Sequence, residues 1–532
     1  MMIDRPESFS PFTGRWIARI GHSIICQGGS PDQVFSAAKS IRGKERFIIS
    51  YIPLADIMTF PPVFYKIQEI LAGEAGVYLV GGAVRNALLN QLANDLDFAV
   101  ASNVEKLARK VSRELHTDFY PLDAEREAYR LIFSDHDGMI QYFDFSRIRG
   151  NSIDSDLSGR DFTINAMAVR LNDHQKLIDP LGGAQDLRDK NIKACCSSSI
   201  QDDPIRILRA IRFAAAGGYK IASETRNQLK VGVQLLKLVS VERKRDELFK
   251  IMSLDQLLAA LRALDWLGVF PVLFPEIRPT IDNAMQNVDA FQTKMDFSSS
   301  GEIVRLVNLI TRKNVSEDVG SLLSGMAGSV LDRFRQEFKA YLIQKYTPDR
   351  NFYQLLQTGN LLYLIQKWPG TPGESGLKNI KEMNLSREEV HFITNLTSFP
   401  DSMEKIIKAD ATLTRRDAFL FFNSTGSAGI AATILYLGNY LASQNKDLDP
   451  DKWKMLLEKT GFLWDAWWNK YTEIIDPKPL LDGDEIALEF HLTPGPIIGK
   501  CLDFLRAEQA AGGINSRNDA IVKIGKMIKE LD

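Results

Sequence analysis

The stretch LVGGAVRNALLNQLANDLDFAV, residues 79–100, decides the fold of this chain. It begins in a short apolar segment, residues 77–80, that is typical of a buried strand. Two glycines then lead into a helix predicted over residues 83–89. A second strand is predicted over residues 95–100, and it begins with Asp-Leu-Asp. A strand, a helix and a strand in such close succession predict a domain of helices on a sheet.

The same stretch carries residues of unusual chemistry. Asp95 and Asp97 point to one face of their strand, because side chains alternate along a strand. Two neighbouring carboxylates repel unless a cation lies between them, and their oxygens suit Mg²⁺; a solvated strand end explains them without a metal. The preceding Gly81 and Gly82 favour the metal explanation over the solvated strand end. Glycines and a helix N-terminus let a phosphate approach closely, and Arg85 adds a charged donor one turn later.

The neighbouring segments extend this sheet. A helix is predicted over residues 104–115, and strands are predicted over residues 129–133 and 140–145, with a turn at residues 136–138 between them. Hairpins therefore occur beside crossovers, and the sheet is expected to be mixed.

The first 58 residues predict a separate β-β-α-β module. Its strands are expected near residues 15–20, 22–27 and 46–52. Its helix is expected to begin with Ser30 as the N-cap and Pro31 at the first helical position. A module of this size has a thin core.

From about Asp203 the chain is helical almost to its end. Long helices are predicted over residues 204–216, 240–252 and 254–267, and the polar segment 282–301 is predicted to be a loop or linker. Four tryptophans share one helical stretch at a spacing typical of core packing: Trp453, Trp464, Trp467 and Trp468.

The composition excludes several classes of protein. The chain has 532 residues, 45% hydrophobic and 25% charged, which excludes a disordered or fibrous protein. The 65 lysines and arginines nearly balance the 67 acids, so the overall charge indicates no nucleic-acid partner. Four cysteines without metal-ligand spacing predict a reduced, cytoplasmic protein. No signal-peptide pattern and no apolar run near the ~20 residues of a membrane span is present, so no membrane association is expected.

Five motifs, in order, resemble the bacterial-type (class II) tRNA nucleotidyltransferases and poly(A) polymerases. They are LVGGAVRNALL with NDLDFAV (79–100), SGRDFTINAMAV (158–169), IDPLGGAQDLRDKNI (178–192), DDPIRILRAIRFAA (202–215) and VSVERKRDELFKI (239–251). The resemblance covers about residues 64–275, and residues 480–514 are similar to the family's tail segment.

The resemblance implies an α+β fold, with a nucleotidyltransferase head on a mixed sheet followed by a mostly α-helical neck, body and tail. The expected boundaries are residues 1–58 for the N-terminal module and 59–200 for the catalytic head. Residues 201–277 would form the neck, which binds the nucleobase and RNA. Residues 278–532 would form the body and tail, which bind tRNA.

The resemblance also implies catalytic roles. Asp95 and Asp97 would bind two Mg²⁺ ions, which activate the RNA 3′-hydroxyl and stabilise charge on the α-phosphate as pyrophosphate leaves. Asp144 is the candidate third carboxylate; an ion pair with Arg147 or Arg149 explains it equally well. The triphosphate would be held by residues of the first motif: Gly81, Gly82 and Arg85.

The second motif contributes Arg160 and Asp161, which in the family meet the nucleotide and its ribose. Asn165 lies one helical turn further and either supports Asp161 or bonds the backbone at a helix start. The family usually has two arginines before the aspartate. Here Gly159 replaces the first, so the contact made by that arginine is not implied for this chain.

The fourth motif forms an inclined ridge of charged residues along a helix: Asp203, Arg206, Arg209 and Arg212. In the family, the positions of Asp203 and Arg206 read the incoming base. A carboxylate accepts from the amino group of adenine or cytosine, and a guanidinium donates to the ring nitrogen beside it; guanine and uracil present the reverse pattern. Asp203 with Pro204 also fits a helix N-cap. Arg209 and Arg212 would reach phosphates, with a structural ion pair as the alternative for Arg212.

The fourth and fifth motifs lie in a locally basic stretch. Residues 204–250 hold eleven lysines and arginines against four acids, a net charge of +7. Such a stretch is typical of an RNA-backbone footprint and equally of a charged helical surface. In the fifth motif, Glu242, Arg243 and Glu247 are expected to orient the fourth by ion pairs.

The leading prediction is therefore a template-independent nucleotidyltransferase that adds C and A to tRNA 3′ ends from CTP and ATP and releases pyrophosphate. Its runner-up adds only A, to tRNA or as a poly(A) tail, and residues 118–138 do not separate the two. An inactive RNA-binding protein on the same fold is the alternative of another class. Mg²⁺ is the expected cofactor. The sequence indicates neither the oligomeric state nor the role of the N-terminal module.

Overall fold

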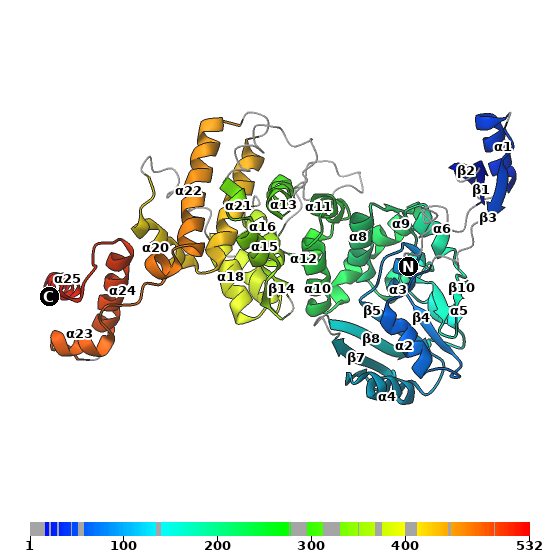
Figure 1. Ribbon diagram of the computed structural model, residues 1–532, viewed down its shortest axis with the longest axis horizontal. Helices are drawn as coiled ribbons and strands as arrows, with labels where there is room; N and C mark the ends of the chain where they lie inside the picture. Colours follow the sequence, from blue (N-terminus) through cyan, green and yellow to red (C-terminus); the bar gives the residue numbers. More distant parts are fainter. Residues whose placement is uncertain are drawn as a thin grey trace, which may run out of the picture. The chain divides into compact units, whose positions relative to one another are not determined.

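The computed structural model divides the chain into two compact units, Met1–Leu235 and Leu236–Asp532, each with its own buried core (Figure 1). The structure describes residues 16–20, 23–28, 31–43, 45–51, 58–134, 140–275, 277, 295–311, 330–348, 350–367, 375–398, 412–444, 448–493 and 495–531. The division falls inside the neck that is predicted over residues 201–277.

The first unit is built on a seven-stranded sheet of order β10-β9-β4-β5-β8-β7-β6. Its strands are β4 (Val77–Val80), β5 (Asp95–Val100), β6 (Asp118–Asp123), β7 (Ala128–Ser134), β8 (Ile140–Arg147), β9 (Ala168–Arg170) and β10 (Asp173–Ile178). Strands β5 and β8 run parallel, and the other neighbours run antiparallel. Because a parallel pair needs a long crossover, the chain forms α4 (Val104–Leu115), β6 and β7 between them. The predicted mixed sheet is confirmed.

The two faces of this sheet differ, because successive side chains point to opposite sides. On one face, Phe98 of β5 stacks on Phe145 of β8, with ring centroids 4.8 Å apart. Helix α4 packs on β7 and β8 and buries its own apolar side. The opposite face carries Asp97 of β5 and Asp144 of β8, which are register partners. The fold therefore keeps the carboxylates away from the apolar layer.

The structure confirms the bounds of several predicted elements, but the strands at both edges of the sheet were not predicted. Strands β4 and β5 and helix α4 match, and α3 (Gly82–Leu88) starts one residue early. Strand β6 was not predicted, because it contains Pro121 and is largely exposed. It lies at the sheet edge, where a proline needs no ladder partner for its missing N–H. Strand β10, at the other edge, was missed because its sequence is polar. The turn predicted at residues 136–138 lies outside the described residues.

The predicted β-β-α-β module is confirmed. Strands β1 (Trp16–Ile20), β2 (Ser23–Gly28) and β3 (Ile48–Tyr51) form an antiparallel sheet of order β2-β1-β3. Helix α1 (Pro31–Arg42) begins at Pro31, as predicted, and packs on the sheet through Val34 and Ala38. Ser30 lies outside the described residues.

The second unit is helical, as predicted. Its longer helices are α10 (Val241–Met252), α11 (Leu257–Trp266), α13 (Ser298–Thr311), α15 (Arg335–Ile343), α16 (Phe352–Gln366), α17 (Ser375–Glu382), α18 (Arg387–Ser398), α20 (Arg415–Thr425), α21 (Ala428–Ser443), α22 (Pro450–Trp468), α24 (Pro496–Ala510) and α25 (Arg517–Leu531). The loop predicted over residues 282–301 is wrong at its end, where α13 begins at Ser298; residues 282–294 lie outside the described residues.

Two of the four tryptophans of α22 are buried in the core, as predicted, whereas Trp467 and Trp468 are half-buried. Trp453 and Trp464 are 1% exposed or less. The Trp464 indole N–H donates to Thr433 Oγ1 at 2.8 Å, so its one polar atom is satisfied inside the core. Within the described ranges, no single helix is long and apolar enough to cross a membrane. Helices α20 and α21 reach that length and hydropathy only together, and they are bent by 103°.

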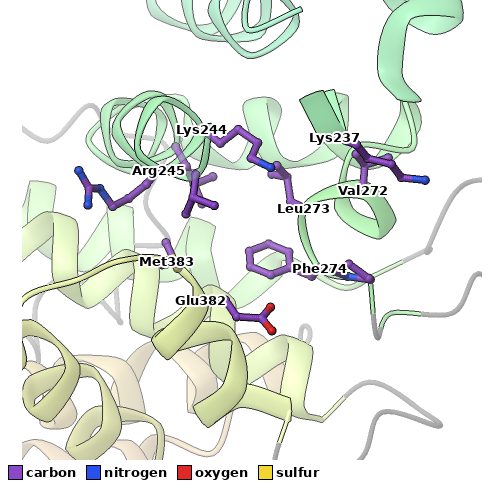
Figure 2. Close-up of a pocket in the computed structure, with 11 residues that line it drawn as sticks. Lys237, Lys244, Arg245, Val272, Leu273, Phe274, Glu382 and Met383 are labelled. Carbon is purple, nitrogen blue, oxygen red and sulfur yellow. The ribbon is translucent and has the colours of Figure 1, made fainter. Parts of the chain in front are cut away.

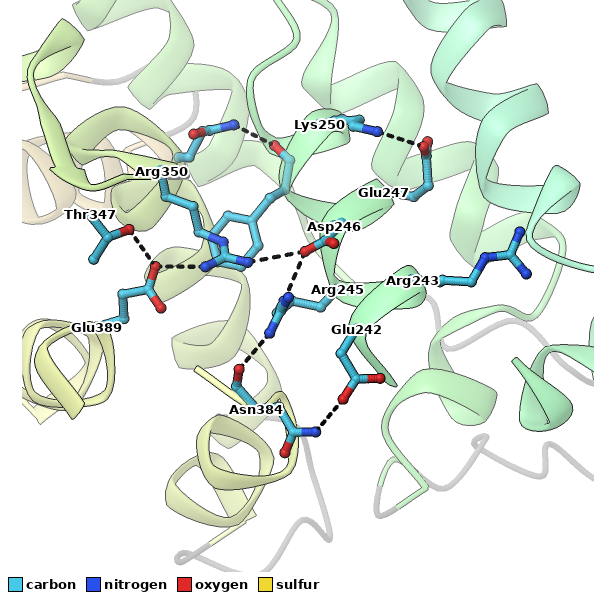
Figure 3. A network of polar contacts seen from close by, with 12 residues as sticks. Glu242, Arg243, Arg245, Asp246, Glu247, Lys250, Thr347, Arg350, Asn384 and Glu389 are labelled. Carbon is cyan, nitrogen blue, oxygen red and sulfur yellow. Dashed lines mark hydrogen bonds and ion pairs between the residues drawn. The ribbon is translucent and has the colours of Figure 1, made fainter. Parts of the chain in front are cut away.

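A network of ion pairs ties α10 to the helices that follow it (Figure 3). Arg350, 6% exposed, donates to Glu389, 1% exposed, at 2.8 Å and to Asp246 of α10 at 3.1 Å. The Arg350 guanidinium also lies 4.5 Å from the ring centroid of Phe249. Glu389 accepts a further bond from Thr347 at 2.9 Å. The buried charges are therefore paired and hydrogen-bonded, which is the condition for their burial.

We predict that Glu389→Ala strongly destabilises the second unit, because it leaves the buried Arg350 without its carboxylate. Removing one partner of a buried pair costs about 3–5 kcal/mol of the free energy of unfolding. Chemical denaturation followed by tryptophan fluorescence measures the loss. Glu388→Ala, at the exposed neighbouring position, is the control and should change stability by less than ~0.5 kcal/mol. Equal stability of the two variants would contradict the prediction.

The same pair predicts a pH dependence. Burial raises the pKa of Glu389, but the hydrogen bonds from Arg350, Ser386 and Thr347 outweigh it, and the pKa lies below its ordinary value. A lowered carboxyl pKa stabilises the fold above the unfolded pKa, and this stabilisation is lost as the pH falls through the folded pKa. The stability difference between Glu389→Ala and the native chain should therefore shrink on acidification below about pH 4.

Candidate active site

Two carboxylates of β5 lie on one face of the sheet, as the Asp-x-Asp spacing predicts. Asp95 and Asp97 are the first and third residues of the strand. Asp97 is the register partner of Val80 on β4 and of Asp144 on β8. Asp95 is exposed and Asp97 is half-buried. The site therefore opens to solvent at Asp95 and is closed around Asp97.

The surroundings of Asp97 disfavour its charge. Burial is the main cause, and the carboxylates of Asp144 and Asp95 add to it, so the pKa of Asp97 rises to about 6 although Arg160 and Arg130 oppose the shift. A cation between the carboxylates would remove this penalty. A raised carboxyl pKa within a group of acids is therefore a feature expected of a cation site.

Asp144 lies beside Asp97, but an arginine already neutralises it. Arg130 of β7 donates through Nε and Nη2 to the two oxygens of Asp144 at 2.8 and 2.7 Å. The alternative partners considered from the sequence are wrong: the Arg147 side chain pairs with Glu127, and Arg149 contacts Asp156 through its backbone N–H. A bidentate pair fixes the orientation of the carboxylate and leaves its remaining lone pairs for a ligand.

The residues present fit a divalent cation that is shared with a substrate. Within the described ranges, no group of three or more His, Cys, Asp or Glu side chains could hold a metal ion by itself. A small hard cation such as Mg²⁺ is commonly held by one or two carboxylates, and takes its other ligands from water and phosphate oxygens. Asp95 and Asp97 supply two oxygen donors on one face. Burial, with the nearby carboxylates, raises the pKa of Asp97, and a cation would relieve this penalty on its charge.

Gly81 brings the first motif against the second. Its φ of +74° is rarely adopted by residues with a side chain, and its N–H donates to the Met167 carbonyl at 3.2 Å. A Cβ at Gly81 would lie 3.1 Å from Arg160 Nη1 and 3.6 Å from Asp97 Oδ2. Glycine is therefore required both by the backbone and by the close approach. Gly82 follows as the first residue of α3.

A chain of hydrogen bonds joins three motifs. Arg85 of α3 donates to Asn165 Oδ1 at 2.6 Å, and Asn165 Nδ2 donates to Asp161 Oδ1 at 3.2 Å. Arg209 of α8 (Arg206–Gly217) donates to Asp161 Oδ2 through Nε at 2.9 Å and Nη2 at 2.5 Å. The support that Asn165 was predicted to give Asp161 is confirmed. Arg209, predicted to reach phosphates, instead pairs with Asp161 in this state.

The Asp161 carboxylate is satisfied by the protein itself. It is 7% exposed, and the N–H of Phe162 donates to it at 2.8 Å. Burial raises the pKa of Asp161, but Arg209, Phe162 and Asn165 together lower it below its ordinary value. Asp161 is therefore ionised, and a ribose hydroxyl would have to compete with these donors for its oxygens.

Phe213 of α8 is a residue that the sequence reading missed. The guanidinium carbons of Arg212, Arg85 and Arg209 lie 4.3, 5.3 and 5.5 Å from its ring centroid. An aromatic face attracts cations, so the ring holds together three groups that repel one another. Burial lowers the pKa of Arg85, and Arg212 and Arg209 add to this. The sequence signal that could have identified Phe213 is its position as an aromatic residue next to the arginines of the fourth motif.

Arg206 holds the backbone of the second motif. It is 7% exposed, and it donates through Nη1 to the Arg160 carbonyl at 2.9 Å and to Ser199 Oγ at 2.8 Å. Its Nη2 donates to the Gly159 carbonyl at 2.8 Å. To contact a base as predicted, Arg206 would have to give up one of these hydrogen bonds.

Asp203 is not a helix N-cap, so this alternative is wrong. It ends α7 (Ser199–Asp202) with an extended backbone and is partly exposed, whereas the N-cap of α8 is Ile205. Pro204 separates the two helices, because the residue before a proline avoids the helical conformation. The Asp203 side chain is therefore not committed to capping α8.

Gly159 is not required by the backbone. Its φ is −82°, and a Cβ there would make only ordinary contacts, at 3.6 Å from the Asp156 carbonyl. The following residue, Arg160, donates through Nε and Nη2 to buried Asp156 at 3.0 and 2.9 Å. The arginine that the family usually has at this position would fit the backbone.

The fifth motif lies on α10, whose described partners belong to the second unit (Figure 3). Glu242 accepts from Asn384 Nδ2 at 2.7 Å, and Glu247 pairs with Lys250 at 3.0 Å. Arg245 donates to the Asn384 carbonyl. Orientation of the fourth motif by these residues stays a prediction, because that motif belongs to the first unit.

Comparisons with known proteins show the family of this chain. The family described as "Poly A polymerase head domain" matches residues 77–193, and "Probable RNA and SrmB- binding site of polymerase A" matches residues 218–281. The A-adding tRNA nucleotidyltransferase of Deinococcus radiodurans is 33% identical over 475 residues, which cover 86% of this chain and 96% of that enzyme. The chain belongs to the tRNA nucleotidyltransferase and poly(A) polymerase family.

Other relatives of this nucleotidyltransferase bear different activity names. The CC-adding tRNA nucleotidyltransferase of Geobacter sulfurreducens is 36% identical over 248 residues, which span 46% of this chain and 57% of that enzyme. The CC-adding enzyme of Synechocystis sp. is 25% identical and covers 83% of this chain and 91% of its own length.

The predicted α+β fold is confirmed by solved structures. A CCA-adding enzyme with ATP matches with a TM-score of 0.58 and 22% identity, covering 88% of this chain and 95% of that chain. The Thermotoga maritima CCA-adding enzyme complexed with tRNA matches with a TM-score of 0.55 and 22% identity. The match covers 89% of this chain and 98% of that chain. At this identity the likeness concerns the fold alone.

We predict that Asp97→Asn abolishes nucleotide incorporation and stabilises the metal-free protein. Because the pKa of Asp97 is raised to about 6 from 3.8, folding of the metal-free protein weakens as the pH rises between these values. At neutral pH the amide removes a penalty on the order of 1–3 kcal/mol and raises the Tm. Asp95→Asn, at the exposed position, should abolish incorporation with a much smaller rise in Tm. Full activity of Asp97→Asn would disprove the metal assignment.

We predict that Phe213→Leu raises the KM for the incoming nucleotide about tenfold, since each exposed cation–π contact contributes about 0.5–1 kcal/mol. Leucine keeps the apolar packing, so the Tm should change little. Phe213→Tyr keeps the ring face and is the control. Steady-state kinetics with varied nucleotide measure the effect, and equal KM values for the leucine and tyrosine variants would refute it.

Proposed function

We propose that this nucleotidyltransferase adds C and A residues to the 3′ end of tRNA from CTP and ATP. The observation that supports it most is the pairing of two site features: the Asp95–Asp97 carboxylates and the arginines around Phe213. The first suits a cation that bridges to phosphates, and the second suits the charge of a triphosphate. Relatives named CC-adding and A-adding tRNA nucleotidyltransferases support the tRNA substrate.

In the proposed reaction, the RNA 3′-hydroxyl oxygen bonds to the α-phosphorus, the bond to the bridging oxygen breaks, and pyrophosphate leaves. Mg²⁺, held by Asp95 and Asp97, would lower the pKa of the hydroxyl and neutralise the phosphate charge. Arg130 keeps Asp144 oriented beside Asp97. Arg85 contributes positive charge where the triphosphate would lie.

Base selection is proposed for Asp203 and Arg206. The carboxylate accepts from the amino group that adenine and cytosine share, and the guanidinium donates to the ring nitrogen beside it. Arg206 now donates to the Gly159 and Arg160 carbonyls, so a bound base would take over one of these bonds. Base recognition would thereby be coupled to the position of the second motif.

Addition of A alone is the second candidate. The observation that favours it is the alignment with 96% of the A-adding enzyme of Deinococcus radiodurans. We also retain the cytoplasm as the proposed location, which the free state of all four cysteines supports.

The deciding experiment uses tRNA transcripts that end at the discriminator base, after C and after CC, with CTP, ATP or both. We expect C, C and A to be added in order to the shortest transcript. Addition of A only to the CC-ending transcript would replace the proposal with A addition, and A tails on any RNA would indicate a poly(A) polymerase. No incorporation by the native chain, with RNA still bound, would indicate an inactive RNA-binding protein.

A further inference from the structure

A pocket in the second unit shares no residue with the candidate active site (Figure 2). It has a volume of about 270 Å³ and lies among α10, α12 (Phe270–Leu273) and α17. Most of its lining is apolar: Val241, Leu248, Val272, Leu273, Phe274, Pro275 and Met383. The volume is just below the ~300 Å³ of the smaller ligand pockets, which suits one ring system better than a large cofactor.

Cations line the same pocket. Lys237 is exposed and Lys244 is half-buried, and neither ammonium group has a hydrogen-bond or ion-pair partner within the described ranges. Arg245 is held in place by the Asn384 carbonyl and by Asp246, so it forms a fixed wall. Glu382 is the one acid among the lining residues. Figure 2 shows the Phe274 ring between the Lys244 and Glu382 side chains.

The chemistry of this lining selects an amphipathic anion. Apolar walls with an aromatic ring take a flat, weakly polar group, and two unpaired ammonium groups take a phosphate. Glu382 disfavours a dense polyphosphate and can accept from an exocyclic amino group. A nucleotide within an RNA chain has one phosphate and one flat base, and unstacked bases are the usual targets of such pockets.

We propose that this pocket holds one unpaired nucleotide of the RNA substrate, with its base against the Phe274–Leu273 wall and its phosphate at Lys237 and Lys244. The pocket residues of α10 and α12 lie within residues 218–281, which match the family described as a probable RNA-binding site. Glu382 and Met383 of the pocket wall lie outside this range. The proposal deepens the function proposed above and rests on RNA as the substrate.

The charge part is tested with Lys244→Ala and with the double variant Lys237→Ala/Lys244→Ala. Lys381→Ala, at an exposed lysine of α17 that does not line the pocket, is the control. tRNA binding is measured against salt concentration with the full chain. Loss of the contact to this one single-stranded phosphate should lower the slope of log K against log salt by about 0.7 in the double variant, and Lys244→Ala should lower it by part of that amount. The KM for CTP and ATP should stay unchanged.

The pocket part is tested with Leu273→Trp, which fills the space without changing the charge. We expect tRNA binding to weaken about tenfold with an unchanged salt slope. Val241→Phe fills the same pocket from α10 and replaces Leu273→Trp if the Tm of the latter falls.

Three results would overturn the proposal. Lysine variants that weaken binding while both filling variants bind normally would reveal a charged patch without a base pocket. A double variant Lys237→Ala/Lys244→Ala with the same salt slope as Lys381→Ala would rule out the phosphate contact. Native tRNA binding by all variants, with loss of a protein partner instead, would assign the pocket to that partner. Failure of the function proposed above is recognised separately, because the native chain would then add no nucleotide to tRNA.

Discussion

The ion pair between Arg209 and Asp161 is the contact on which the candidate active site depends. Asp161 is buried, so its charge persists only because Arg209, Asn165 and the Phe162 N–H surround it. Through the pair, the helix of the fourth motif is fixed against the second motif, and Asn165 extends the link to Arg85 of the first. Loss of one donor would leave a buried carboxylate partly unpaired, which is the costly state for such a group. The three motifs are therefore one electrostatic unit.

Two groups of like charge lie in this unit, one on the sheet and one around Phe213. On the sheet, burial raises the pKa of Asp97, and the nearby carboxylates of Asp144 and Asp95 add to the shift. On α8, Arg209 and Arg212 gather with Arg85 around Phe213, and their repulsion contributes to the lowered pKa of Arg85. A cation with a nucleoside triphosphate would relieve both penalties at once. In the function we propose, the site therefore binds a metal ion and a triphosphate together, because neither partner alone would compensate both groups.

Much of this site followed from local rules, and the missing parts depend on contacts between distant segments. The shared face of Asp95 and Asp97 follows from the alternation of a strand, and the link from Asn165 to Asp161 follows from a spacing of four residues. The partner of Asp144 could not be predicted, because Arg130 reaches it only through the register of β7 with β8. Nearby arginines were therefore the wrong candidates. Phe213 was missed for a related reason, since its three cations meet only after α3 and α8 are packed.

The role of the basic stretch changes when its residues are located. Counting charge over residues 204–250 treats every lysine and arginine as available to RNA, yet Arg206 and Arg209 are committed to the protein's own carbonyls and carboxylate. Two arginines of the fourth motif therefore serve internal organisation in this state, and we propose that cations for RNA lie further along the chain. Lys237 and Lys244 are such cations, because no described partner neutralises them. In this proposal, a nearly neutral protein binds RNA through few charged contacts, because bases that pack on the apolar surface beside these contacts contribute the rest of the binding free energy.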